Sequence, residues 1–475
     1  MEFDITKAHC IYFKEISKIP HGSGNEQALS DWICQLAEQR GLCVRQDELG
    51  NVIVYVPATA GYENHRGVIL QAHMDMVCEK ESGSTHDFTT DPLDLYVDGT
   101  LLRARGTTLG ADDGMGVAYM LDIMTDESLP HPYLELCFTV QEEVGLVGVK
   151  ALKAEYFRAR RLINLDGGGE VCTYTSLSGS RTMEIVKRLE WQEMSVAGFS
   201  CVVEGLRGGR LGDDISKERA NAWKLMARVL YYFHCHGVQI RLARVTSGKN
   251  SGIPERAEVD FVSSSEAAYL KELLDQVWED IRQEYEYTDP DIQISLSQTD
   301  VRRVADQAGS LALIKLLYLL PFGVKARFLT LEGLPSYSAN VGRVELCGDM
   351  ICIGCSARSP FDSCMQDGEM TVELLCRLCK AEITDINDYY GYRYEKDSPL
   401  RKIMDQVYLE QYGKPLQHVA AHGGNECGAF KHLFPDMDIV TSGAIYDDPH
   451  TPNETLDLES FDRCIRFLKT FLTRL

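Results

Sequence analysis

Three apolar stretches of this chain have the character of buried strands, and each ends in residues that can bind a metal ion or move a proton. The stretches span residues 67–72, 133–140 and 161–165. The residues that follow them are, in chain order, His73 and Asp75, Glu142 and Glu143, and Asp166. In open α/β sheets, ligands bind at the carboxyl ends of the strands. The pattern therefore predicts an α/β domain whose chemistry lies at one edge of one sheet.

A further acidic position precedes a helix rather than following a strand. The glycine-rich segment 105–116 contains Asp112 and Asp113 and leads into the apolar helical segment 117–124. Glycines let the backbone approach a neighbour closely, and a helix N-terminus favours anions. The two acids therefore either cap this helix or bind a cation. Spacing alone does not say which of them would be the ligand.

Four of these residues belong to successive strand–helix units, so we expect their side chains to converge at the same sheet edge. The four are His73, Asp112, Glu143 and Asp166. Any one acid could be a cap or a turn residue, but a converging group needs a cation to balance its charge, which predicts a metal site. Side chains alternate along an extended segment, so His73 and Asp75 point the same way. One of them can then bind the metal while the other supports it.

Charge and composition argue against several kinds of partner. The 475 residues include 71 acidic and 48 basic side chains, a net charge of −23, which disfavours nucleic acid and anionic membranes. The sequence shows no run of eighteen apolar residues and no basic and apolar leader, so we expect a cytoplasmic protein. The sixteen cysteines are scattered through apolar contexts, so we expect reduced thiols rather than a disulfide framework.

The pattern of elements changes after Asp166. Residues 185–392 alternate strands with amphipathic helices, which is typical of an α+β domain inserted into an α/β domain. We therefore expect a catalytic domain built from residues 1–184 and 393–475. Near its start, Ser23 and Glu26 have the spacing of a capping box for the helix that follows. Near its end, His450 stands on a rigid loop between two prolines.

Longer motifs extend this pattern over nearly the whole chain. The metal-binding pattern reads His73-x-Asp75, Gly110-Ala111-Asp112-Asp113-Gly114, Glu142-Glu143, Asp166 and Pro449-His450. Additional ordered motifs occupy residues 16–21, 23–26, 57–61, 70–77, 86–88, 105–112 and 426–428. Together they resemble the M20-type di-zinc metallopeptidases, and within them the aminoacyl-histidine dipeptidase branch (Xaa-His dipeptidase, cytosol non-specific dipeptidase). The resemblance implies a three-layer zinc-exopeptidase catalytic domain with an inserted α+β lid domain.

The resemblance also implies roles for individual residues and a cofactor. In the family pattern Asp112 bridges two zinc ions, with His73 and Asp166 completing one site and Glu143 and His450 the other. Asp75 orients His73, Glu142 is the general base, and the peptide between Asp112 and Asp113 is cis. The implied cofactor is a pair of Zn²⁺ ions, with Co²⁺ or Mn²⁺ as alternatives. The implied assembly is a homodimer formed through the inserted domain.

The inserted domain departs from the family pattern in places. Family members carry Gly-Gly-His-Ser-Gly, whose histidine stabilises the developing oxyanion, and Arg210 stands at that position here. Ser251 begins a segment where Asn-Ala-Ile-Pro-Arg-Glu is usual. Arg358 matches the family's substrate-carboxylate arginine, and Asn340 keeps a matching Asn-x-Gly context. Glu426 is either a contact near the substrate's amino end or a structural turn acid.

The resemblance implies a metallodipeptidase that hydrolyses short unblocked peptides, of the Xaa-His type or more broadly, with a water activated by two zinc ions. A small peptide is the expected partner. The changes at Arg210 and Ser251 motivate two alternatives. One is an aminoacylase-like or other amide hydrolase on the same fold, and the other is a catalytically silent metal-binding homologue.

Overall fold

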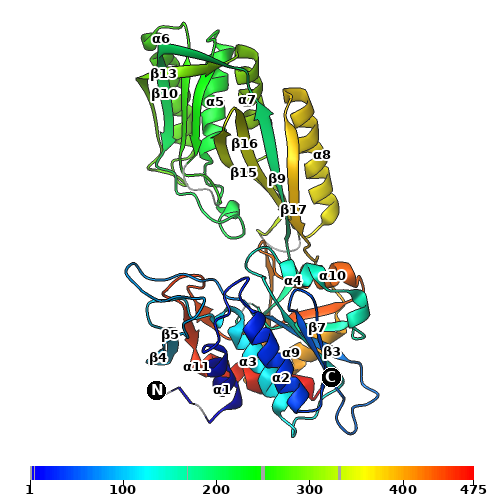
Figure 1. The fold of residues 1–475 in the computed structure, drawn as a ribbon. Helices are drawn as coiled ribbons and strands as arrows, with labels where there is room; N and C mark the ends of the chain where they lie inside the picture. The colour runs from blue at the N-terminus through cyan, green and yellow to red at the C-terminus, as the bar shows by residue number, and fades with distance from the viewer. Residues whose placement is uncertain (1–2, 5, 168, 248–251, 330–332) are drawn as a thin grey trace. The chain divides into compact units, whose positions relative to one another are not determined.

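The computed structural model describes residues 3–475 except residues 5, 168, 248–251 and 330–332. The chain divides into two compact units. The first unit contains residues 1–176, 392–420 and 425–475, and the second contains residues 177–391 and 421–424. Figure 1 shows the elements of each unit. Ser251, which the sequence singled out, lies outside the described residues.

The first unit is built on a mixed sheet. Its strands, in spatial order, are β1 (Cys43–Gln46), β2 (Val52–Val56), β6 (Leu134–Thr139), β3 (Val68–His73), β7 (Arg161–Asn164) and β19 (Asp438–Thr441). The strands β6, β3, β7 and β19 run parallel, whereas β1 and β2 pair antiparallel at the other side. Every residue of β3 and β6 is buried, as expected for parallel strands covered on both faces. Their carboxyl ends therefore meet at one edge.

Helices cover this sheet. They are α1 (Ala8–Ile16), α2 (Gln27–Gln39), α3 (Ala111–Thr125), α4 (Val147–Ala151), α9 (Pro399–Tyr412), α10 (Cys427–Leu433) and α11 (Leu458–Leu472). α3 packs against β3, and its residues from 113 to 124 are all buried. A helix that is apolar on all sides belongs in a core. α11 is amphipathic instead and buries Phe461, which stacks on Tyr119 of α3 with 4.9 Å between ring centroids.

Smaller elements complete the first unit. A second sheet has the order β20 (Tyr446–Asp447), β21 (Thr455–Asp457), β5 (Leu101–Ala104) and β4 (Leu95–Asp98). A strand pair joins β8 (Cys172–Leu177) to β18 (Gln417–Ala421), and a short 3₁₀ helix spans Ala154–Tyr156. Because β20 and β21 flank residues 448–454, the small sheet fixes the two ends of the loop that carries His450.

The second unit contains two sheets with helices. One sheet has the order β11 (Arg241–Ser247), β12 (Ala257–Val262), β10 (Trp191–Glu204) and β13 (Gln293–Ala305). The other has the order β14 (Gly323–Arg327), β15 (Pro335–Cys347), β16 (Met350–Ser359), β9 (Gly179–Arg188) and β17 (Glu382–Tyr389). The helices are α5 (Ala222–Cys235), α6 (Ala267–Glu284), α7 (Gln307–Leu319) and α8 (Asp362–Cys379), with a 3₁₀ turn at Ile215–Lys217. The larger apolar core of this unit includes the fully buried Trp223 of α5 and residues of both sheets. α8 lies alongside the edge strand β17 (Figure 1).

Candidate metal centre

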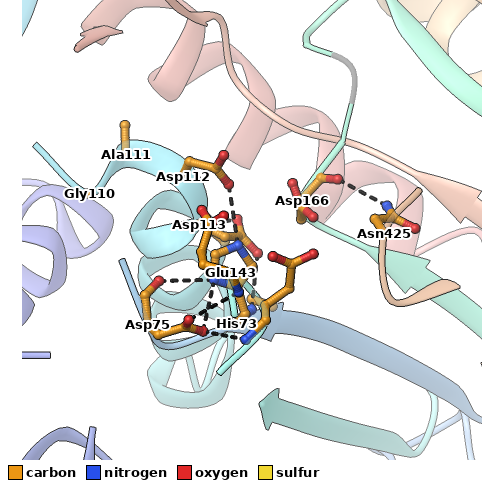
Figure 2. A network of polar contacts seen from close by, with 12 residues as sticks. His73, Asp75, Gly110, Ala111, Asp112, Asp113, Glu143, Asp166 and Asn425 are labelled. Carbon is orange, nitrogen blue, oxygen red and sulfur yellow. Dashed lines mark hydrogen bonds and ion pairs between the residues drawn. The ribbon is translucent and has the colours of Figure 1, made fainter. Parts of the chain in front are cut away.

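His73 is the last residue of β3, and its ring is held in one orientation. Its Nδ1 lies 2.9 Å from the backbone carbonyl oxygen of Asp75. A carbonyl oxygen can only accept, so Nδ1 carries the hydrogen and the lone pair of Nε2 is left to face a metal ion. That Nε2 lies 3.3 Å from Oδ1 of Asp112. The ligand atoms of His73, Asp112 and Asp166 all lie within 4.8 Å of one another (Figure 2).

A second group of ligand atoms shares Asp112 with the first. It contains Asp112, Glu143 and His450, again within 4.8 Å of one another. Nε2 of His450 lies 3.4 Å from Oδ2 of Asp112 and 2.7 Å from Oε1 of Glu143. The two oxygens of Asp112 therefore face different histidines. This is the arrangement that a carboxylate bridging two cations requires.

Asp113 has a different environment from its neighbour. Its Oδ1 accepts a hydrogen bond from the backbone N–H of Gly116, and its Oδ2 accepts one from the backbone N–H of His73. The side chain is fully buried and contacts the backbone. Asp112 rather than Asp113 is thus available as a ligand, a choice that spacing left open. The peptide between them is cis, which confirms that prediction.

The donor set fits divalent cations. Burial raises the pKa of Asp166 well above its usual range, and the charge of Asp112 raises it further. Cations at the centre would keep such carboxyls ionised. His450 gives a second observation, because its Nε2 makes no hydrogen bond with any described residue despite its short distance to Glu143. A nitrogen and an oxygen so arranged are positioned as ligands to a common ion rather than as a hydrogen-bonded pair.

Glu142 lies beside this group without joining either of the sets that contain Asp112. Its carboxyl is grouped with ligand atoms of His73 and Glu143. Burial raises the pKa of Glu142 well above its usual range, and Glu426, Glu143 and Asp112 raise it further. A carboxyl with a raised pKa next to a metal site can accept a proton and release it again near neutral pH.

Asp75 supports the turn that carries these two glutamates. Its Oδ1 accepts a hydrogen bond from the backbone N–H of Glu142, and its Oδ2 accepts one from the backbone N–H of Glu143. Its Oδ1 also lies 3.4 Å from Nδ1 of His73. Asp75 is 1% exposed, so these bonds form away from solvent. The side chain therefore contacts both the histidine and the glutamate turn.

The capping-box prediction for Ser23 and Glu26 is wrong. Helix α2 begins at Gln27 without a side-chain cap. Ser23 Oγ instead donates a 2.7 Å hydrogen bond to Oδ2 of Asp75, and Oε1 of Glu26 accepts one from the backbone N–H of Gln141. Gln141 has φ of 53°, a left-handed conformation that side chains rarely adopt. Both residues thus hold the turn before the candidate base, a contact that local spacing could not reveal.

Glu426 is completely buried in the first unit. Its Oε2 accepts hydrogen bonds from Nε2 of Gln71 and, at 2.7 Å, from Oγ1 of Thr139. Its Oε1 has no hydrogen-bond partner among the described residues. Burial raises the pKa of Glu426 to about 7. The next residue back, Asn425, donates to the backbone oxygen of Asp166 (Figure 2).

The remaining predicted site residues lie in the second unit. Arg358 of β16 donates from Nη1 to the backbone oxygen of His422, and its Nε has no partner among the described residues. Asn340 is buried and its amide donates to the backbone oxygen of Gly252 and accepts from Asn221. Its amide is therefore occupied within the unit.

Arg210 lies on an exposed loop of the same unit. Its backbone N–H donates to Oδ2 of Asp214, 2.8 Å away. The backbone N–H of Asp214 donates back to the oxygen of Arg210, and the Asp214 carboxylate also pairs with Lys217 and Arg219. The side chain at this position extends from an anchored loop.

A mixed sheet whose parallel strands carry two ligand groups that share one carboxylate suits a metal-dependent peptidase. The chain belongs to peptidase family M20/M25/M40, which it matches over residues 69–474. It is 33% identical over 455 residues to the cytosol non-specific dipeptidase of Escherichia coli K12, covering 94% of this chain and 93% of that protein. The described residues contain no helix suited to crossing a membrane.

Solved structures agree with this assignment. Aminoacylhistidine dipeptidase from Vibrio alginolyticus matches with a TM-score of 0.88 at 30% identity, covering 98% of this chain and 96% of that one. The aminopeptidase PepT of Bacillus cereus matches with a TM-score of 0.61 at 15% identity, which shows a shared fold. The match at 30% identity confirms the predicted α/β catalytic fold with its added lid domain.

Proposed function

We propose that this chain is a metallodipeptidase that hydrolyses short unblocked peptides at a two-zinc centre formed by the two groups around Asp112. Its family and its dipeptidase relatives identify the chain as a metal-dependent peptide-bond hydrolase. The observation that carries the proposal is the placement of Asp112, whose two carboxylate oxygens face the two candidate ligand histidines, His73 and His450. The similarity to dipeptidases over nearly the full length supports a dipeptide substrate.

The residues around the metal centre divide the chemistry between them. Zinc ions held there would polarise the scissile carbonyl and lower the pKa of the attacking water. Glu142 accepts the proton of that water and transfers it to the leaving amine. Asp75 keeps the Glu142 backbone in place while it does so. The fixed tautomer of His73 keeps its Nε2 free as a ligand.

Four residues are proposed to serve substrate binding, three of them by direct contact. Arg358 pairs with the terminal carboxylate of the peptide, Arg210 stabilises the developing oxyanion, and Glu426 lies toward the substrate's amino end. Asn340 contributes by holding the segment at Gly252, because its amide is hydrogen-bonded there.

A dipeptide panel tests the proposal. The zinc-loaded protein is expected to release amino acids from free dipeptides, to lose this activity on chelation and to regain it with Zn²⁺. Glu142→Ala should lower kcat about 10²–10⁴-fold while two metal equivalents remain bound. A panel without turnover, or unchanged kcat in Glu142→Ala, contradicts the proposal. Faster hydrolysis of N-acylated than of free dipeptides would favour the aminoacylase-like alternative instead.

We also propose a cytoplasmic homodimer. The relative from Escherichia coli is described as cytosolic. In the second unit, α8 exposes Met370, Leu374 and Leu378 at intervals of four residues, so the three form one apolar stripe. The adjacent strand β17 is a sheet edge and exposes Ile386. An apolar stripe next to an open edge suits a second copy of the chain, because both features would be covered together.

A further inference from the structure

Glu454 makes an unusual set of contacts for a residue outside the ligand set. It is 2% exposed and lies just before β21. Its Oε2 accepts hydrogen bonds from the backbone N–H groups of Leu109 and Gly110, at 2.8 and 3.0 Å. Its Oε1 accepts from those of Ala111 and Asp112, at 2.8 and 3.3 Å. One carboxylate thus binds the N–H groups of successive residues that end at Asp112.

These contacts pair backbone N–H groups that precede the regular part of α3, because the backbone at Asp112 and Asp113 is not helical. Gly110 precedes α3 with φ of 69° and provides no side chain to accept the first N–H groups (Figure 2). Unpaired N–H groups in a buried position are costly. A buried carboxylate pairs with such N–H groups through charge-assisted hydrogen bonds.

Glu454 also belongs to the loop of His450. The two residues are separated by one turn, in which the backbone N–H of Glu454 donates to the oxygen of Thr451. Asp448 and His450 both have positive φ, 51° and 62°, which is unusual for residues with side chains. Such a backbone conformation persists when surrounding contacts fix it. The bonds from Glu454 to the 109–112 backbone are contacts of this kind.

We propose that Glu454 is a positioning residue that joins the loop of His450 to the backbone of Asp112, so that both ligands face the same metal ion. The inference rests on the proposed two-metal function. Without the Glu454 carboxylate, the two segments would still carry their ligands but would lose the contact that sets their spacing. A residue that merely paired these N–H groups would affect stability and leave metal binding unchanged.

The test compares Glu454→Gln with Glu135→Gln. Glutamine keeps the size of the side chain but has one acceptor oxygen, so its NH₂ group would face N–H donors. Glu135 is an internal match, since it is fully buried and accepts from the backbone N–H groups of Arg158 and Ala159. It belongs to neither of the candidate ligand groups around Asp112. Zn²⁺ affinity and stoichiometry are measured by competition with a chromophoric chelator. Spin coupling between the two metal ions is measured by electron paramagnetic resonance of the Mn²⁺-loaded protein.

Glu454→Gln is expected to bind one of its two metal equivalents at least about 10-fold more weakly and to lose the coupled Mn²⁺ signal. Glu135→Gln should bind metal like the wild type, even if its unfolding temperature falls by as much as that of Glu454→Gln. Equal affinity and coupling in both variants would overturn the inference while leaving the proposed function intact. If the wild type itself bound no metal pair, both would be overturned. If Glu454→Gln does not fold, the same titration is made on Glu454→Asp. Aspartate keeps the charge but has a shorter reach.

Discussion

The carboxylate of Asp75 accepts a 2.9 Å hydrogen bond from the backbone N–H of Glu142. Its other oxygen accepts one from Glu143 at 3.2 Å, and Ser23 donates to the same oxygen. The proposed general base and a proposed metal ligand are therefore held by one buried side chain. Since Asp75 also lies beside His73, a change at this residue affects each part of the site that follows β3 or β6.

Asp75→Asn is expected to lower kcat about 10–100-fold. The amide has one acceptor oxygen in place of two, so at least one backbone N–H of the glutamate turn loses its partner. Steady-state kinetics on a free dipeptide, with metal content measured in parallel, checks the prediction. Ser23→Ala is the matched control, because it removes one hydrogen bond to Asp75 and keeps the charge. Its kcat should fall much less, and equal losses in the two variants would contradict the assigned role.

What the sequence could predict depends on whether a residue follows a strand or lies in a loop. His73 and Thr139 are paired across two neighbouring parallel strands. The sequence can predict such a pair, because an apolar run that ends in polar residues indicates where a buried strand ends. The choice between Asp112 and Asp113 required the backbone, because adjacent residues share the same local pattern. Glu454 was missed because its partners lie more than 340 positions away in the chain. Periodicity carries no information about such a contact.

The buried carboxyl of Glu426 predicts a pH-dependent stability. Its pKa in the folded chain is about 7, against 4.5 for an exposed glutamate. Between these values the folded state keeps a proton that the unfolded state has released, so stability falls as pH rises through this window, by about 3 kcal/mol. Glu426→Gln cannot titrate and should lack this part of the decline. Urea unfolding of metal-free wild type and variant at pH 4.5 and pH 8 measures the difference. An equal decline in both proteins would show that folding does not raise the pKa of Glu426.

Arg210 is expected to act in turnover rather than in substrate binding. Arg210→Ala should lower kcat about 10²–10³-fold with little change in KM, because an oxyanion donor acts mainly in the transition state. Arg210→His places the family's residue at this position and should retain more activity than alanine. Lys217→Ala, in the 3₁₀ turn that follows this loop, serves as the control. A kcat of Arg210→Ala near that of the wild type would remove Arg210 from the site.

The apolar stripe on α8 predicts that one substitution can separate the proposed dimer. Leu374 is 58% exposed at the middle of the stripe, and an arginine there would place a charge inside an apolar interface. Leu374→Arg is therefore expected to sediment as a monomer where the wild type sediments as a dimer. Leu409 of α9, in the first unit, is 52% exposed and provides the control, since Leu409→Arg should leave the dimer intact. A dimer that persisted in Leu374→Arg, or a monomeric wild type, would exclude this stripe as the interface.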